Sequence, residues 1–188
     1  MAAVVGGVLF VIGDLLGLVT FGGEVAETAT TGAFFVQQFL YLLGSVLILF
    51  GLFGLYASQS EATGTLGLVG FLIAFLGTAL AAGAGWDQAF IAPRIAELEP
   101  GLLGMPNLAF PLSFAIFAVG WLLFGIATLR AGVYPRVAAI LLIVGAVLTF
   151  VSFLFPASGL VLGIGVAWLG FVLFTGGSAP AEQPSRVS

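Results

Sequence analysis

The sequence predicts an all-α protein of six transmembrane helices, with both termini on the cytoplasmic side and one long extracytoplasmic loop. Three observations carry this prediction. The 188 residues are 61% hydrophobic and 6% charged, with a mean hydropathy of +1.28, more apolar surface than a soluble domain can carry. Six apolar runs are long enough to cross a hydrocarbon core of about 30 Å. Two of the four basic residues, Arg130 and Arg136, lie in one short turn between two of these runs.

This turn sets the predicted orientation in the membrane. Arginines in short loops are retained preferentially on the cytoplasmic side. Gly132 suits a helix C-cap and Pro135 suits the first turn of the next helix, so we expect a tight cytoplasmic hairpin. With six spans, Arg186 in the tail is also cytoplasmic, and Arg94 alone lies outside. An odd number of spans fits the arginines less well.

The predicted spans form a single transmembrane domain over residues 1–175. Their limits are about 2–21, 34–56, 66–85, 108–129, 137–155 and 159–175. Residues 22–31 and 86–107 are expected outside the membrane, and residues 58–64 inside. The tail, residues 176–188, is rich in Gly, Ser, Pro and charged residues, and we expect it to be disordered.

The connection at 86–107 is too polar and too rich in proline to be a span. Pro93 can start a short helix that Pro100 stops, and Ile95 and Leu98 share one face of it. Two interpretations remain open. The segment lies flat at the membrane surface as an interfacial helix, or it is an ordered lid packed on the bundle.

Small residues recur at helical spacing in three spans, which is typical of membrane helices that approach each other closely. They are Gly13 and Gly17 in the first span, Gly70, Ala74, Gly77 and Ala81 in the third, and Gly159, Gly163 and Ala167 in the sixth. We expect the stripe in the sixth span to pack on another helix, with the third span as the favoured partner.

Asp14 is the one ionisable residue well inside a predicted span, where a charge costs at least ~2.5 kcal/mol. We therefore expect a protonated carboxyl that donates a hydrogen bond to a neighbouring helix. Two roles remain open. Asp14 is a functional proton site, or it is a structural group that fixes helix order through a backbone carbonyl or a hydroxyl of Tyr41, Ser45 or Ser113.

Other polar residues near the outer ends of the spans suggest a vestibule leading to Asp14. These residues are Gln37, Gln38, Asp87 and Arg94. The alternative is an ordinary outer interface, in which Arg94 pairs with Glu97 or Glu99.

The absences in the sequence exclude whole classes of chemistry. The chain contains no Cys, His or Lys, which removes thiol catalysis, Cys/His metal sites, Schiff bases and a Ser-His-Asp triad. We expect no enzyme activity, cofactor or metal. The net charge of −4 provides no basic surface, so we expect no nucleic-acid partner.

The sequence favours a non-enzymatic accessory or self-associating membrane subunit, in contact with lipids and with further copies or other membrane subunits. We expect it in the plasma (inner) membrane of a prokaryote. The alternative is a small proton-coupled transporter or channel with Asp14 as its proton site. A polar path from outside to Asp14 separates the two, because a subunit has a dry centre and a transporter a hydrated cavity.

Overall fold

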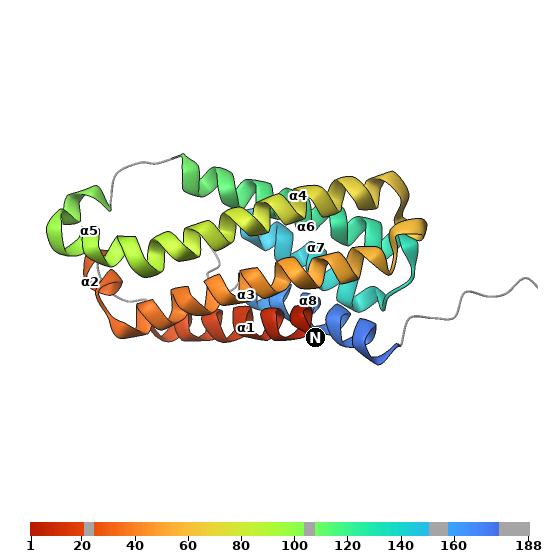
Figure 1. Ribbon diagram of the computed structural model, residues 1–188, viewed down its shortest axis with the longest axis horizontal. Coiled ribbons are helices and arrows are strands. Elements are labelled where there is room, and N and C mark those ends of the chain that lie inside the picture. The colour runs from red at the N-terminus through yellow and green to blue at the C-terminus, as the bar shows by residue number, and fades with distance from the viewer. Residues whose placement is uncertain (21–24, 104–107, 151–157, 177–188) are drawn as a thin grey trace, which may run out of the picture.

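The computed structural model describes residues 1–20, 25–103, 108–150 and 158–176, and every regular element in these ranges is a helix (Figure 1). The long helices are α1 (Ala2–Thr20), α3 (Gly32–Ala57), α4 (Ser60–Trp86), α6 (Ala109–Ala131), α7 (Arg136–Phe150) and α8 (Ser158–Thr175). The short ones are α2 (Val25–Ala29), α5 (Ala92–Leu98), a π-helix η1 (Asp87–Ile91) and a 3₁₀ helix η2 (Pro100–Leu102).

The lengths of these helices agree with a membrane protein. Five helical segments are long and apolar enough to cross a bilayer, and α7 is a shorter apolar helix of 15 residues. The predicted span 137–155 runs past Phe150 into 151–157, which lie outside the described residues, as do residues 177–188 of the predicted tail. In lipid the helix is favoured because it pairs its own backbone groups.

The six long helices form a closed ring in chain order. Each packs against the next, and α8 returns to pack against α1. Neighbouring helices run in opposite directions, so the bundle has two distinct ends (Figure 1). We call the end with α2 and α5 the lid end, and the end with the α3–α4 and α6–α7 turns the hairpin end.

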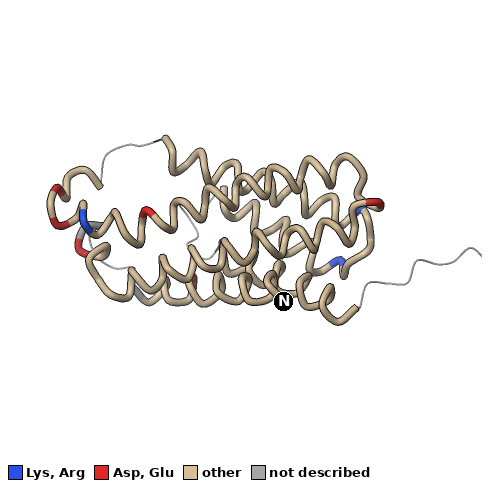
Figure 2. Tube along the Cα trace, viewed as in Figure 1, with Lys and Arg blue, Asp and Glu red and all other residues tan. Residues whose placement is uncertain are grey.

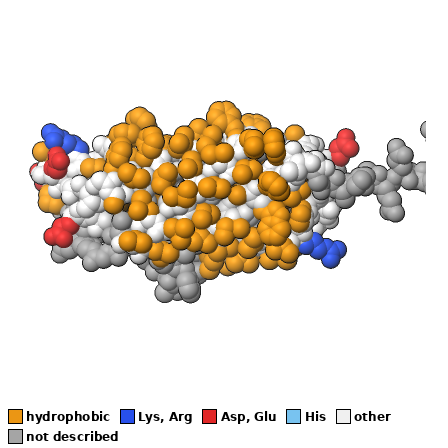
Figure 3. All heavy atoms as spheres, turned by 90° about the horizontal axis from the view of Figure 1, so that it is seen from below, with side chains coloured by type: hydrophobic (Ala, Val, Ile, Leu, Met, Phe, Trp, Pro, Cys, Tyr) orange, Lys and Arg blue, Asp and Glu red, His pale blue; other side chains and the backbone are white. Residues whose placement is uncertain are grey.

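Large buried side chains fill the half of the ring nearer the hairpin end. They include Ile48, Leu52, Leu55, Trp121, Phe124, Leu142, Val166 and Leu169, each fully or almost fully buried. The outer surface is also apolar. Exposed side chains such as Val8, Leu72 and Phe171 contribute to a hydrophobic belt, with charged groups gathered near the ends of the molecule (Figure 3). Such a belt is typical of a surface that faces lipid.

The predicted small residues on α4 allow very close contact with α6. A Cβ added at Gly70 would lie 2.7 Å from the backbone nitrogen of Phe124, and one added at Gly77 would meet the backbone of Phe117. Ala74, between them, is fully buried. Side chains larger than these would force the two backbones apart.

The stripe on α8 packs against α1, and our expectation that α4 would be its partner is wrong. A Cβ added at Gly163 would lie 2.7 Å from the carbonyl oxygen of Gly7, and Gly7 in turn faces Ala167. The reason is the closed ring, which brings the first and last helices side by side.

Two connections are more helical than we predicted. The 58–64 segment is largely the start of α4, which begins at Ser60 and bends at Gly64, where φ is 55°. Of the predicted connection 86–107, residues 86–98 continue α4 through η1 into α5, with Pro93 in the first turn of α5, and residues 104–107 lie outside the described residues. A wider π-turn directly before the proline relieves the clash between its ring and the preceding turn.

Side-chain hydrogen bonds join the α3–α4 turn to the α6–α7 hairpin at the hairpin end. The hydroxyls of Ser58 and Tyr134 lie 2.6 Å apart, and Gln59 Nε2 donates to Thr128 Oγ1 over 3.0 Å. Gly132 ends α6 in the left-handed conformation, with φ 65°, as its C-cap position predicted. Burial raises the pKa of the Tyr134 phenol, and the Ser58 hydrogen bond opposes this shift.

Candidate functional site

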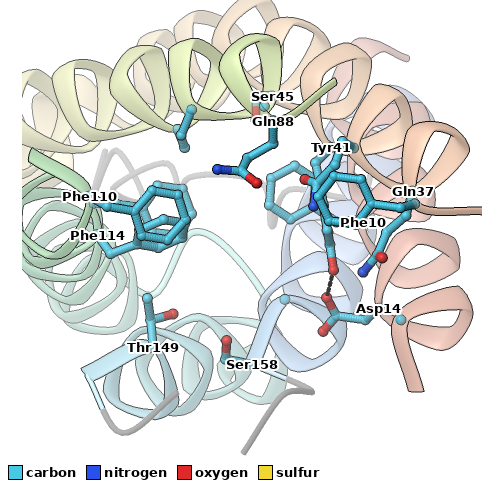
Figure 4. A pocket seen from close by; sticks show the side chains of 18 residues that line it. Phe10, Asp14, Gln37, Tyr41, Ser45, Gln88, Phe110, Phe114, Thr149 and Ser158 are labelled. Atoms are coloured by element: carbon cyan, nitrogen blue, oxygen red, sulfur yellow. Dashed lines mark hydrogen bonds between the residues drawn. The ribbon is translucent and has the colours of Figure 1, made fainter. Parts of the chain in front are cut away.

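A cavity of about 360 Å³ occupies the ring above the packed core, toward the lid end. Its polar lining consists of Asp14, Gln37, Gln38, Tyr41, Ser45, Gln88, Thr149 and Ser158. Its aromatic lining consists of Phe10, Phe34, Phe110, Phe114 and Phe117, and Gly17, Ala81, Ala84, Gly85 and Gly159 complete it. The cavity is partly open rather than enclosed. Figure 4 shows side chains from several helices converging on it.

Asp14 joins three helices on one wall of this cavity. It is 4% exposed and lies six residues before the end of α1, about 9 Å along the axis. The Tyr41 hydroxyl on α3 donates to its Oδ1, and the Leu160 amide of α8 donates to its Oδ2. A carboxylate at a helix N-terminus is favourable, because it accepts a free N–H and faces the positive end of the helix dipole.

The geometry of Asp14 differs from our expectation of a carboxyl that donates a hydrogen bond, since both of its oxygens accept one. Of the three hydroxyls we considered as partners, Tyr41 bonds to it. Ser113 instead donates to the carbonyl of Ala109 in its own helix over 2.7 Å. Gly159 is required beside the carboxyl, because a Cβ there would lie 2.8 Å from Oδ1.

Two further polar groups of α3 are buried at the cavity without satisfied partners. Gln37 is 3% exposed and Ser45 is 1% exposed. Within the described part of the chain, neither Gln37 Oε1 nor Ser45 Oγ has a hydrogen-bond partner. The Gln37 side chain is hydrogen-bonded to the Tyr41 hydroxyl, which links it to Asp14. A buried polar atom left unpaired costs about 1–3 kcal/mol, so these atoms call for a partner inside the cavity.

The opposite wall is aromatic. The rings of Phe110 and Phe114 on α6 lie 4.8 Å apart, centroid to centroid, and face the pair formed by Asp14 and Tyr41 across the cavity (Figure 4). Phe10 packs edge-on against Tyr41, at 5.5 Å. The cavity therefore has one acidic, hydrogen-bonding wall and one apolar, polarizable wall.

Sequence reasoning identified part of this site and missed part of it. Gln37 and Gln38 line the cavity with Asp14, as the vestibule hypothesis placed them. Asp87 is exposed and lines a neighbouring, more open groove that shares Ala84 and Phe110 with the cavity. Arg94 pairs with Glu97 over 2.8 Å on the exposed surface of α5.

Gln88 is a cavity residue that the sequence did not indicate. It lies in the π-helix η1, and its side-chain amide projects into the cavity (Figure 4). π-Turns often occur at functional sites because they rotate one residue away from its helical position. The only signal in the sequence was Pro93, five residues later. It indicated a break in the helix but did not predict the π-turn that precedes it.

The two ends of the bundle differ in charge (Figure 2). Charged residues gather at the lid end on α2, on α5 and directly after α5, and these are Glu27, Arg94, Glu97 and Glu99. Those at the hairpin end are Glu61, Arg130 and Arg136. The cavity thus lies toward the acidic end of the molecule.

No protein-family model, curated protein or solved structure matches the chain.

Proposed function

We propose that this protein is a non-enzymatic, proton-coupled membrane transporter that binds a small molecule in the central cavity and uses Asp14 as its proton site. The observation that carries the proposal is the partly open cavity of about 360 Å³ that reaches the Asp14 carboxyl. An accessory subunit, which the sequence alone favoured, needs a filled centre instead. Ligand pockets in proteins typically have volumes of about 300–1,000 Å³.

The proposed topology has six spans, with both termini and the hairpin end in the cytoplasm. Arg130 and Arg136 at the hairpin end support this orientation through the preference of arginine for the cytoplasmic side. The 15 described residues of α7 make about 22 Å of helix, and residues 151–155 of the predicted span 137–155 lie outside the described residues. Lipids cover the hydrophobic belt, and the cavity opens toward the outside.

The hydrogen bonds of Asp14 suggest how a proton is coupled to movement. They tie α8 to α1 and α3, at the place where the ring closes. Protonation removes the negative charge that favours both donors, which weakens the attachment of the α8 N-terminus. The packed core below the cavity blocks a path to the hairpin end in this state. Rocking of helices about a central site is an established way to alternate access in membrane transporters.

The contacts of the small residues favour the transporter over the accessory subunit. Gly70 and Gly77 are covered by α6, and Gly163 is covered by α1. These small residues are therefore covered by neighbouring helices of the same chain and are not available for contacts with a second subunit.

Cysteine accessibility tests the proposal, because the chain contains no cysteine of its own. Gln88→Cys places a thiol in the cavity, and Leu52→Cys places one in the packed core. In right-side-out vesicles, a membrane-impermeant maleimide should label position 88 and leave position 52 unlabelled. Failure to label position 88, with Glu97→Cys labelled normally on the surface, would show that the cavity is not reached from outside.

The proton site is tested by the pH dependence of the same reaction. The labelling rate of Gln88→Cys, divided by that of Glu97→Cys to remove the intrinsic effect of pH on thiols, should change as the medium is acidified. Adding Asp14→Asn should abolish this change. An unaltered pH dependence in the Asn variant would exclude Asp14 as the proton site.

A further inference from the structure

We infer that the cavity recognises an arylalkyl ammonium ion, with its N–H groups beside Asp14 and Gln37 and its ring against Phe110 and Phe114. This inference rests on the proposed function, in which the cavity binds a small molecule, and it specifies the chemistry of that molecule. Four observations support it: the charge of the lining, its unpaired acceptors, its aromatic wall and the charge of the lid end.

The first observation is the charge of the lining. Among the described residues that surround the cavity, Asp14 is the one acidic side chain and none is basic. Among these residues, the N-terminal end of the α8 helix dipole is the positive partial charge next to the Asp14 carboxyl. A carboxylate can accept about four hydrogen bonds, and three are provided by the Tyr41 hydroxyl and by the backbone of Leu160 and Gly159. The remaining capacity and the uncompensated charge favour a cation that donates hydrogen bonds.

The second observation is the pair of unpaired polar atoms. Gln37 Oε1 can only accept a hydrogen bond, and it lies on the same helix face as Tyr41, one turn away. It has no partner among the described residues, and neither has Ser45 Oγ. A hydrocarbon ligand would leave Gln37 Oε1 unpaired, and an anion would be repelled by both Asp14 and this oxygen. The N–H groups of an ammonium ion can donate one hydrogen bond to Asp14 and another to Gln37 Oε1.

The third observation is the aromatic wall. Phe110 and Phe114 stand opposite Asp14 (Figure 4), and Phe10 lies beside Tyr41. Aromatic faces attract cations, most strongly where water is excluded, and aromatic rings also stack on each other. A volume of about 360 Å³ accommodates one ring and a short alkylammonium chain.

The fourth observation is the charge of the lid end, toward which the cavity lies. Glu27 and Glu99 lie there together with the exposed pair of Arg94 and Glu97. Acidic groups around a cleft raise the local concentration of cations and their rate of entry. This end would disfavour an anionic substrate.

A proton and the ammonium ion compete for the same carboxyl, which provides the coupling that the proposed function requires. Tyr41 is the titratable side chain that faces Asp14 from α3. Neither α1, apart from Asp14, nor the described helix α8 contains another titratable side chain. Binding of the ammonium ion should therefore weaken as the solution is acidified and Asp14 takes up a proton.

The test uses the full chain purified in a neutral detergent and three probes of similar size. Tritiated phenethylammonium is measured by equilibrium dialysis. Phenethyltrimethylammonium, which keeps the charge and lacks N–H donors, and 2-phenylethanol, which is neutral, are used as competitors. Phenethylammonium should bind saturably, and 2-phenylethanol should displace it at least about tenfold less well than unlabelled phenethylammonium. The quaternary ion should lie between the two.

Variants assign the effect to the named groups. Asp14→Asn should weaken phenethylammonium binding by about tenfold or more, whereas Asp87→Asn, the same change of charge outside the cavity, should leave it within about twofold. Gln37→Leu leaves the Asp14 cap of α8 intact, so it covers the case in which the Asn variant unfolds. It should weaken binding of phenethylammonium more than that of the quaternary ion.

The outcomes separate this inference from the proposed function. Equal displacement by the neutral alcohol, or equal loss in the Asp14 and Asp87 variants, would overturn recognition of a cation. Equal binding of the two ammonium ions would overturn the role of Gln37 as an acceptor. If no probe binds but position 88 is still labelled from outside, the ligand class is wrong and the transporter proposal stands. Loss of that labelling would defeat the proposed function itself.

Discussion

Replacing Gly163 by alanine tests the closure of the ring with a single methyl group. The added Cβ would lie 2.7 Å from the carbonyl oxygen of Gly7 and 3.1 Å from Cβ of Phe10. The first contact falls about 0.7 Å short of the 3.4 Å at which ordinary van der Waals contact begins. The obstructing atom belongs to the backbone, so a side-chain rotation cannot relieve the overlap and α1 and α8 must separate.

The expected cost follows from two opposing effects. Overpacking in a tightly packed interior costs about 1–3 kcal/mol. Alanine inside a helix is favoured over glycine by about 1 kcal/mol. The variant should therefore lose up to about 2 kcal/mol of stability. Gly83→Ala on α4 is the matched control, because its Cβ would meet nothing within 4 Å. Gly83→Ala gains helix propensity without the steric overlap that Gly163→Ala creates. The two variants should therefore change the free energy of unfolding in opposite directions.

Thermal unfolding of the purified protein in detergent measures both variants against the wild type. Gly163→Ala should lower the melting temperature, and Gly83→Ala should maintain or raise it. A Gly163→Leu variant should unfold at a lower temperature still. An unchanged melting temperature for both Gly163 variants would mean that this face of α8 meets lipid, and the closed ring would be refuted.

Three further predictions concern polar groups. Asp14→Leu leaves the hydrogen-bond donors of Tyr41 and of the α8 backbone unpaired and should cost about 1–3 kcal/mol, whereas Asp14→Asn retains an acceptor and should cost less. Equal melting temperatures for the wild type and the Leu variant would exclude a structural role for the carboxyl. For topology, Glu97→Cys should react with impermeant maleimide only from outside and Glu61→Cys only from the cytoplasmic side, and the reverse pattern would invert the proposed orientation. Because the pKa of Tyr134 is raised in the folded state, its contribution to stability is present below its unfolded value of about 10 and is lost as the pH rises through the higher folded value. Tyr134→Phe should flatten this alkaline fall in unfolding measurements, and an equally steep fall in the variant would contradict the assignment.

Local signals allowed most of the fold to be predicted from the sequence. Long apolar runs predicted the long helices, and Gly132 marked the end of α6 through the conformation that its cap requires. The connections were predicted less well, because Ser60 and its neighbours are compatible with both helix and loop. The contact between α8 and α1 depends on ring closure between residues far apart in the chain, and no local pattern encodes it.

The candidate site was predicted in part for a similar reason. Asp14 and Gln37 stand out because polar residues are expensive in an apolar helix. Phe110 and Phe114 did not stand out, since the chain has 19 phenylalanines and only the fold distinguishes those that face the cavity from those that face lipid. The position of Gln88 depends on the width of one helical turn, which its sequence does not specify.

The closed ring also has a consequence for biogenesis. Five of its interfaces join helices that follow one another along the described chain, so each can form soon after its second helix enters the membrane. The interface between α1 and α8 joins residues as far apart as Ala3 and Gly170, 167 positions along the chain, and must wait for the last helix. Until then Asp14 lacks its α8 donor, and the glycine face of α1 is open to lipid or to another protein. A nascent chain arrested after α7 should therefore be the form that a membrane insertase or quality-control protease recognises, and arrival of α8 should end that exposure.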